Sequence, residues 1–518
     1  MNATTTPRTW TLSPGGALAL PGAFILALTL AGLGMARPQP VMFASFLGAA
    51  AVAAAWLLVL FAKAQSARRT LTLSWTPKPQ HWVQAIAQAM VYYWWGRYVP
   101  IVGAFVPFIV AQLVFAYAID ALLNWSRRDH YNLGFGPFPI ILSINLFLWF
   151  RPDWFYWQFV MIAVGFLAKE LIRWQRDGRS AHIFNPSSFP LAMVSIYLIA
   201  TQGSDTTFGN LIANTQFDPP HMYLLLFLAA VPGQFLFGVA RMTLSAVLTM
   251  MVISLVYFQA TGTYLFLDAH IPVPVFLGML LLVTDPSTSP RTELGRIMFG
   301  MLYAVLTTVL FLVLPLVGAP TFYDKLLPVP FMNLMVRGID RLAVSQALAA
   351  LDPARLMGSL APMGRNLAFG TVMALVFTGL YGTGALGDHH PGQYLPFWKQ
   401  ACEVGNERAC RYESFLTLTY CNNGSGWACN EAGIQFSEAR RDPGPVFLKG
   451  CELGFSTACT NVARGGAGEP LVREPPLDQD LPIVLRGTKP VLTERDPTAL
   501  RAIGCAQGWT ELCGPTGS

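Results

Sequence analysis

The sequence predicts an all-α protein, in which a polytopic membrane core of about 13 transmembrane helices precedes a disulfide-stapled α-helical repeat domain. Apolar residues make up 53% of the 518 residues and charged residues only 12%, about half the charged share of a soluble domain. Residues 1–387 hold 22 basic and 13 acidic side chains, whereas the rest hold 12 and 15, together with all eight cysteines. This composition excludes an ordinary soluble enzyme. The basic excess belongs to membrane loops, so no nucleic-acid partner is expected.

Apolar runs separated by basic loops define the membrane part. Placing the basic loops on the cytoplasmic side puts the N-terminus in the cytoplasm and the cysteine-rich tail outside. Two helices are expected in residues 1–80, a ten-helix core in 81–342, a connecting segment with the last helix in 343–387, and the external domain in 388–518. The runs lie at about 17–36, 41–64, 81–97, 100–123, 135–151, 154–174, 186–201, 222–240, 242–258, 271–285, 297–317, 324–341 and 365–385.

The ten core runs divide into two groups of five. A repeat with an odd number of spans is inverted relative to its twin, and inverted repeats place a ligand site between the halves. The sequence carries a faint matching signal, with Asn-Pro-Ser-Ser at 185–188 and Asp-Pro-Ser-Thr at 285–288. We therefore expect a 5+5 inverted repeat.

Three segments are too polar for their apolar surroundings, and polar groups at membrane depth usually line a site. In the first, Asn185 is a natural helix N-cap followed by proline, and the free N–H groups of such a helix start suit an anionic ligand; taken by itself, the segment is better explained as a capped helix start at the interface. The second, residues 284–290, contains Asp285 and two prolines, which indicates a broken helix facing a cavity, although a cytoplasmic loop is the alternative. The third places Asn333 within an apolar stretch.

Together these segments resemble the membrane flavoprotein family that contains the Rnf complex D subunit and the B subunit of sodium-pumping NADH:quinone reductase. The resemblance covers about residues 80–342 and implies a core of inverted five-helix repeats that holds flavin and passes electrons across the membrane. The motifs that carry it, in order, are Phe-Asn-Pro at 184–186, Val-Pro-Gly at 231–233, Thr-Asp-Pro-Ser-Thr-Ser-Pro at 284–290, Gly295-Arg296 with Gly300, and Asn333 with Ile339-Asp340.

One departure concerns the cofactor. The family attaches FMN through a threonine of an S/T-G-A-T motif, and this motif is absent from the sequence; the nearest candidates are Thr206 and Thr207 in a predicted outer loop. The resemblance therefore implies flavin, as FMN or riboflavin, with non-covalent binding as the alternative to a bond at either threonine. No catalytic or metal-binding constellation is predicted. The expected flavin-binding residues are Asn185, Ser187, Ser188, Thr284, Asp285, Thr288, Asn333, Thr206 and Thr207.

The cysteines share one spacing, C-x2-G-x4-C. Glycine supplies a left-handed helix C-cap after the first cysteine, and Asn406, Ser425 and Ser456 are placed to cap the next helix, so each pair would staple a helical hairpin. Zinc and haem sites require other spacings, and such disulfides require an oxidising compartment. The units resemble cysteine-rich Sel-one-like repeats, which implies a protein-binding α-solenoid. The expected pairs are Cys402–Cys410, Cys421–Cys429, Cys451–Cys459 and Cys505–Cys513.

These expectations define the functional hypotheses. The first is a subunit of an electron-transport complex in the bacterial inner membrane, working with other electron-transfer subunits and docking a periplasmic protein through its tail. The chain would then be a redox subunit of an oxidoreductase if flavin binds. The alternatives are a flavin-less channel or transporter core, and a scaffold that anchors the repeat domain in the lipid bilayer.

Overall fold

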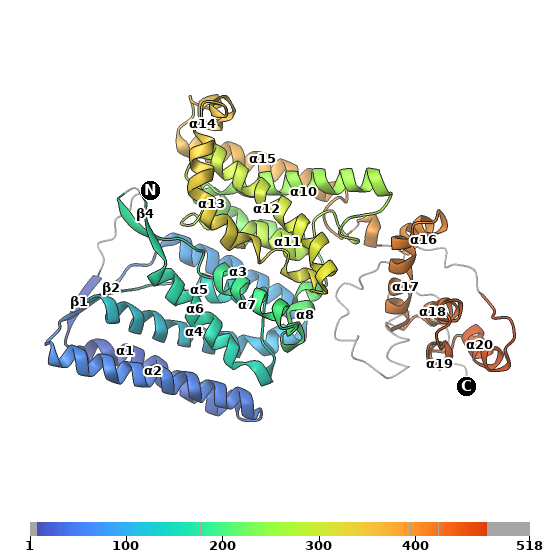
Figure 1. Cartoon of the computed structure of the whole chain (residues 1–518), viewed down its shortest axis with the longest axis horizontal. Coiled ribbons are helices and arrows are strands. Elements are labelled where there is room, and N and C mark those ends of the chain that lie inside the picture. Colours follow the sequence, from blue (N-terminus) through green and yellow to red (C-terminus); the bar gives the residue numbers. More distant parts are fainter. Residues whose placement is uncertain (1–7, 177, 389, 394, 423, 474–518) are drawn as a thin grey trace.

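The structure, a computed structural model, describes residues 8–176, 178–388, 390–393, 395–422 and 424–473. Each of the expected apolar runs contains a helix (Figure 1). These helices are α1 (Pro14–Ala31), α2 (Pro40–Ser66), α3 (Pro79–Tyr98), α4 (Pro100–Arg127), α5 (Pro137–Asn145), α6 (Tyr156–Leu171), α7 (Ser188–Ala200), α9 (Met222–Leu236), α10 (Ala240–Thr261), α11 (Val273–Leu277) continued by the π-helix η4 (Gly278–Leu282), α12 (Glu293–Val313), α13 (Pro328–Ala343) and α15 (Pro362–Gly382).

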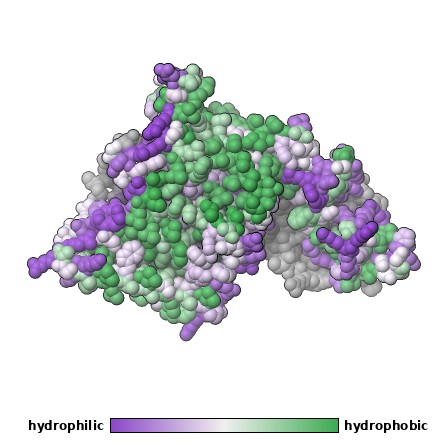
Figure 2. Space-filling model, in the orientation of Figure 1, coloured by the Kyte–Doolittle hydropathy of each residue, from purple (hydrophilic) through white to green (hydrophobic). Residues whose placement is uncertain are grey.

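Six helices among the described residues are long and apolar enough to cross a membrane, which fits a multi-pass membrane protein. Figure 2 shows apolar residues across the face of the helical body, with hydrophilic residues at its edges and over the C-terminal domain. The six lie at Pro14–Ala36, Pro40–Ser66, Pro100–Arg127, Ala240–Thr261, Glu293–Val317 and Pro362–Gly382.

The helices between α3 and α13 form two groups with the same packing pattern. In the first group α4 packs against α6, α6 against α7, and α3 against α5; in the second, α10 packs against α12, α12 against α13, and α9 against α11. The groups meet where α3 packs on α9 and α7 on α13. α1 and α2 pack against α4, and α15 packs against α9 and α10, so these three helices flank the two groups.

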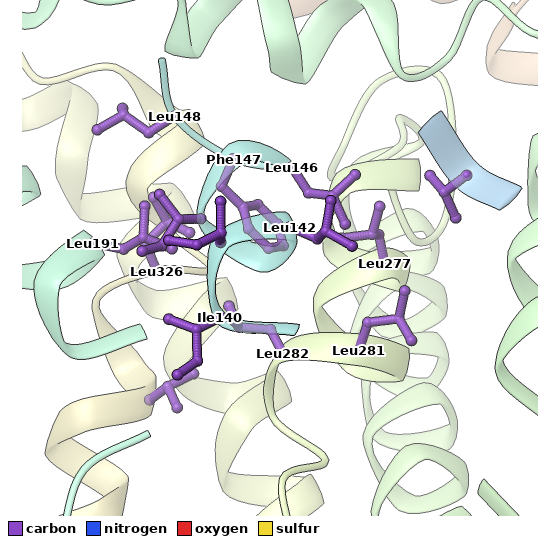
Figure 3. Close-up of a cluster of buried hydrophobic side chains, with 14 of the residues drawn as sticks. Ile140, Leu142, Leu146, Phe147, Leu148, Leu191, Leu277, Leu281, Leu282 and Leu326 are labelled. Carbon is purple, nitrogen blue, oxygen red and sulfur yellow. The ribbon is translucent and has the colours of Figure 1, made fainter. Parts of the chain in front are cut away.

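Short helices fill the centre between the groups. α5 has nine residues, and α11 with η4 has ten in total. Figure 3 shows Leu142 and Leu146 from α5 and its end close to Leu277, Leu281 and Leu282 of the second group. These side chains are buried, so apolar packing holds the two short helices in the interior.

The fold is not strictly all-α, because five short strands lie among the loops of the described part of the chain. β1 (Arg8–Leu12), β2 (Leu71–Trp75) and β3 (His130–Leu133) form one sheet, and β4 (Arg173–Arg176) pairs with β5 (Arg179–His182). The labelled strands lie at one end of the helical body and the C-terminal helices at the opposite end (Figure 1). Backbone pairing lets these polar segments satisfy their N–H and C=O groups where a helix ends.

The C-terminal domain contains a run of antiparallel helices joined by disulfides. The predicted bridges Cys402–Cys410, Cys421–Cys429 and Cys451–Cys459 are present among the described residues, whereas Cys505 and Cys513 lie outside them. The helices are α16 (Leu395–Glu403), α17 (Glu407–Asn422), α18 (Gly426–Glu438), α19 (Gly444–Glu452) and α20 (Ser456–Ala467).

The local geometry of these hairpins follows the predicted caps in part. Gly405, Gly424 and Gly454 have φ values of 91°, 103° and 80°, which is the left-handed region that favours glycine. Asn406 and Ser425 accept backbone N–H groups as caps. The prediction for Ser456 is wrong, because α20 already begins there. Each described bridge joins two consecutive helices across their turn, as predicted, and α17 takes part in two bridges because it carries both Cys410 and Cys421.

Candidate functional site

A cavity of about 400 Å³ lies between the two helix groups. Its walls come from α3, the ends of α4 and α6, the chain between β5 and α7, α9, and the turn after η4. It lies at the strand end of the body, since residues next to β2, β3 and β5 also line it. Four of the predicted residues, Asn185, Ser187, Thr284 and Asp285, line this cavity.

Asn185 shapes the first wall. Its Oδ1 accepts hydrogen bonds from the backbone N–H of Ser187 (2.9 Å) and of Ser188 (3.1 Å) and from the Ser187 hydroxyl (2.7 Å). Its Nδ2 donates to the carbonyl of Leu282 in η4 (3.2 Å). The side chain is 6% exposed. Asn185 therefore binds backbone N–H groups just before α7, whose N-cap position is Ser187 rather than the predicted Asn185. Its side chain also ties this turn to the second helix group.

Asp285 forms the matching wall in the second group. Its Oδ1 accepts from the Ser287 backbone N–H (2.9 Å) and hydroxyl (2.6 Å), and its Oδ2 accepts from the Thr288 hydroxyl (3.1 Å). The helix has already ended at Leu282, and the next helix starts at Glu293, so the segment is not a continuous helix, as both the broken-helix and the loop interpretation require. The Asn-Pro-Ser-Ser and Asp-Pro-Ser-Thr segments thus form the same side-chain-to-backbone turn.

The two turns are also joined to each other through Asn333, outside the cavity lining. The backbone N–H of Asn185 donates to Asn333 Oδ1 on α13 (3.0 Å), and Asn333 Nδ2 donates to the carbonyl of Thr288 (3.1 Å). His182 Nε2 and the Ser287 hydroxyl lie 3.1 Å apart. Burial lowers the pKa of His182, which favours the neutral imidazole. Ser188, Thr288 and Asn333 support the turns from behind and do not themselves line the cavity.

Glutamines satisfy the backbone that the short helix leaves open. Gln84 on α3 donates to the carbonyl of Leu281 (3.1 Å), and Gln234 on α9 donates to that of Leu280 (2.8 Å). Irregular backbone at membrane depth needs such partners. Gln80, Gln84 and Gln88 recur every four residues on α3, so they lie on one face of the helix. This polar face was not predicted, although the four-residue spacing is visible in the sequence.

Charged side chains line the same cavity, and basic ones predominate. Lys169 lies 3.5 Å from Asp120, and Glu170 pairs with Arg128 and with Arg173 (3.7 Å). The basic set is Lys78, Arg128, Lys169 and Arg173, against the acids Asp120, Glu170 and Asp285. The lining thus carries four cations against three carboxylates, and this small positive excess favours an anionic ligand.

Thr206 and Thr207 lie elsewhere. They sit at the 3-10 turn η3 (Ser204–Thr206), next to α8 (Gly209–Thr215), which is at the end nearer to the repeat domain (Figure 1). Thr206 donates its hydroxyl hydrogen to the Gly203 carbonyl (2.7 Å), and Thr207 to that of Ser204 (2.9 Å). The structure therefore does not bring these threonines together with the other predicted residues.

Comparison with protein-family models, with curated proteins and with solved structures finds no match to this chain. The candidate site consequently rests on its geometry: two matching polar turns that meet at one basic cavity between two similarly packed groups of helices.

Proposed function

We propose that this chain is the membrane subunit of an electron-transport complex and that it binds flavin in the cavity. The observation that carries the proposal is the meeting of the Asn185 and Asp285 turns at one cavity. These turns contain the residues on which the resemblance to the Rnf complex D subunit family rests. A site between two helix groups is also what an inverted-repeat membrane protein would provide.

The proposed architecture has thirteen spans with a ten-helix inverted-repeat core. The matched packing of α3–α7 and α9–α13 supports the repeat. Basic residues at the cavity end support a cytoplasmic location for that end, and the disulfides support an oxidising location, the periplasm at a bacterial inner membrane, for the opposite end. Both assignments agree with the positions of the strands and the repeat domain at opposite ends (Figure 1).

The cavity fits a phosphate-bearing flavin such as FMN. Its volume lies within the range of small-molecule sites, Phe166 and Phe237 offer apolar surface for a ring, and Lys78 and Arg173 suit a phosphate. Asn185 and Asp285 are engaged in their own turns, so they shape the wall. Since Thr206 and Thr207 lie outside the cavity, we propose non-covalent binding. When bound, flavin supplies one- and two-electron redox chemistry; the protein orients it and tunes its surroundings.

A second candidate is a flavin-less transporter for a polar anion. It is favoured by the absent S/T-G-A-T motif and by the excess of cations over acids at the cavity. In either case the repeat domain would dock a periplasmic protein, and the electron-transport role requires further subunits as donor and acceptor.

The visible absorption spectrum of the detergent-solubilised, purified chain tests the proposal. We expect a flavin band that moves entirely to the supernatant after acid precipitation, as non-covalent binding requires. A band that stays in the pellet would show covalent attachment and correct the position of the site. A colourless preparation whose proteoliposomes transport an anion without any redox partner would favour the second candidate.

A further inference from the structure

The last described stretch of the chain, residues 469–473, lies extended against two helices of the repeat domain. We name this stretch the strap. Asn461 of α20 contacts both backbone groups of Val472: its Nδ2 donates to the Val472 carbonyl and its Oδ1 accepts the Val472 N–H, each at 2.7 Å. The amide side chain thereby makes the pair of hydrogen bonds that a neighbouring β-strand would make with this residue.

A second asparagine completes the arrangement. Asn430 of α18 also donates to the Val472 carbonyl (3.3 Å), and its Oδ1 accepts from Asn461 Nδ2 (2.8 Å). Both asparagines are 0% exposed. The two buried amides thus hydrogen-bond to each other and to the backbone of one segment, which is the arrangement of a peptide-binding site. Such backbone contacts do not depend on the side chains that the peptide carries.

Side chains at the ends of the strap add selectivity. Arg473 lies 3.3 Å from a carboxylate oxygen of Glu431 and 3.2 Å from one of Glu438, both on α18. Arg464 donates to the Pro470 carbonyl (3.1 Å). The Arg473–Glu438 pair is exposed on both sides and contributes little to affinity. Together the two acids favour a basic residue at this position and disfavour an acidic one.

The site offers more hydrogen-bonding capacity than the strap uses. Oε1 of Glu431 and Oε1 of Gln435 are buried on α18, one helical turn apart, and have no hydrogen-bond partner within the described residues. Buried acceptors of this kind are costly to leave unpaired. They are available to the N–H groups of a peptide that fills this face more completely.

We propose that the face formed by α18 and α20 is a binding site for an extended peptide, that the strap occupies it in cis, and that a partner segment with an apolar residue followed by arginine displaces the strap. This inference rests on the docking role proposed for the repeat domain and gives it a location and a ligand class. A tethered strap competes at an effective concentration in the millimolar range, so the site is closed to weak partners.

The test uses the full chain in detergent and a fluorescent peptide that contains the strap sequence Glu-Pro-Leu-Val-Arg. V472P/R473E removes one clamped N–H and reverses the charge, which should release the strap. We expect this variant to bind the peptide at least roughly tenfold more tightly than the unaltered chain. Adding Asn461→Ala should abolish binding, whereas adding Thr460→Ala, on the exposed side of the same helix, should leave it unchanged.

A second peptide has glutamate in place of arginine. Because both peptides are measured on the same protein variant, a difference between them cannot come from misfolding of that variant. The second peptide should bind V472P/R473E several-fold more weakly than the first peptide. Equal binding of the first peptide to the unaltered chain and to V472P/R473E, binding that survives Asn461→Ala, or equal binding of the two peptides would overturn the proposal. The flavin spectrum of the same samples is measured separately. A failure of the peptide-binding proposal is therefore distinguishable from a failure of the flavin-binding proposal.

Discussion

The Oδ1 atom of Asn333 accepts the backbone N–H of Asn185 at 3.0 Å, although the two residues are 148 positions apart. The amide nitrogen of Asn333 donates to Thr288 in the second turn. One buried side chain on α13 therefore holds both polar turns of the cavity. These two hydrogen bonds explain why a lone asparagine lies within an apolar stretch. Asn333 holds the turns at 185–188 and 285–288 together, although they are far apart in the sequence.

Replacing Asn333 with leucine should destabilise the helical body, because it leaves the Asn185 N–H and the Thr288 carbonyl buried without partners. A loss of about 1–3 kcal/mol is expected for each group left unsatisfied. Thermal unfolding of the detergent-solubilised protein measures the effect. Leu334→Ala is the matched control, since Leu334 is 56% exposed on the same helix; an equal shift for both variants would contradict the role of Asn333.

Lys78→Gln should weaken FMN binding about tenfold and leave riboflavin binding unchanged, because Lys78 lines the cavity as a cation suited to the phosphate. Titration of the flavin-free protein with each flavin, at low and at high salt, measures this difference. Lys63→Gln serves as control, because Lys63 is exposed at the end of α2 and does not line the cavity. If Lys78→Gln weakened both flavins equally, the phosphate would not lie near Lys78.

Gly300→Ala should disrupt the contact between α10 and α12. A Cβ at this position would lie 2.1 Å from the carbonyl oxygen of Met242 and 2.2 Å from the hydroxyl oxygen of Ser245. Small residues permit such close helix approach in membranes. We expect a lowered unfolding temperature and lower yield, whereas Gly338→Ala, with nothing within 4 Å of its added Cβ, should be neutral. Tolerance of Gly300→Ala would show that the two helices are farther apart.

Acid should loosen the repeat domain from the helical body. His270, in the loop after α10, and His390 stack edge to face with ring centroids 4.7 Å apart, and Tyr264 covers both. Burial, followed by the nearby His270, lowers the pKa of His390 from 6.5 to about 3, and burial lowers the pKa of His270. The neutral rings therefore stabilise the packed state fully above pH 6.5, and this stabilisation is lost as the pH falls from 6.5 toward 3.

Hydrogen exchange of residues 390–400 as a function of pH measures this loosening. In the unaltered chain the Gly392 N–H donates to His390 Nδ1. The side chain in His390→Asn can still accept this hydrogen bond, but it cannot take up a proton. Exchange in this variant should depend less on pH than in the unaltered chain. An unchanged pH profile would show that other groups control the contact.

The sequence predicted the features that depend on local patterns. Apolar runs located the helices, and the cysteine spacing located three bridges. The meeting of the turns at 185 and 285 was also predicted, although through the resemblance rather than through spacing.

The features that the sequence did not reveal depend on partners far along the chain. β4 is Arg-Trp-Gln-Arg, which has the composition of a basic loop, and only pairing with β5 makes it a strand. Gln84 is polar in an apolar run because Leu281, from the other helix group, lacks a helical partner for its carbonyl. The strap could not be inferred either, since Val472 is apolar and unremarkable until Asn461 and Asn430 are placed beside it.

An experimental density map of the purified protein in a lipid nanodisc tests the central proposal most directly. We expect density for a three-ring ligand between the turns at 185–188 and 285–288, with its phosphate toward Lys78. A map in which these turns extend into solvent, with no ligand between the two groups of helices, would contradict it.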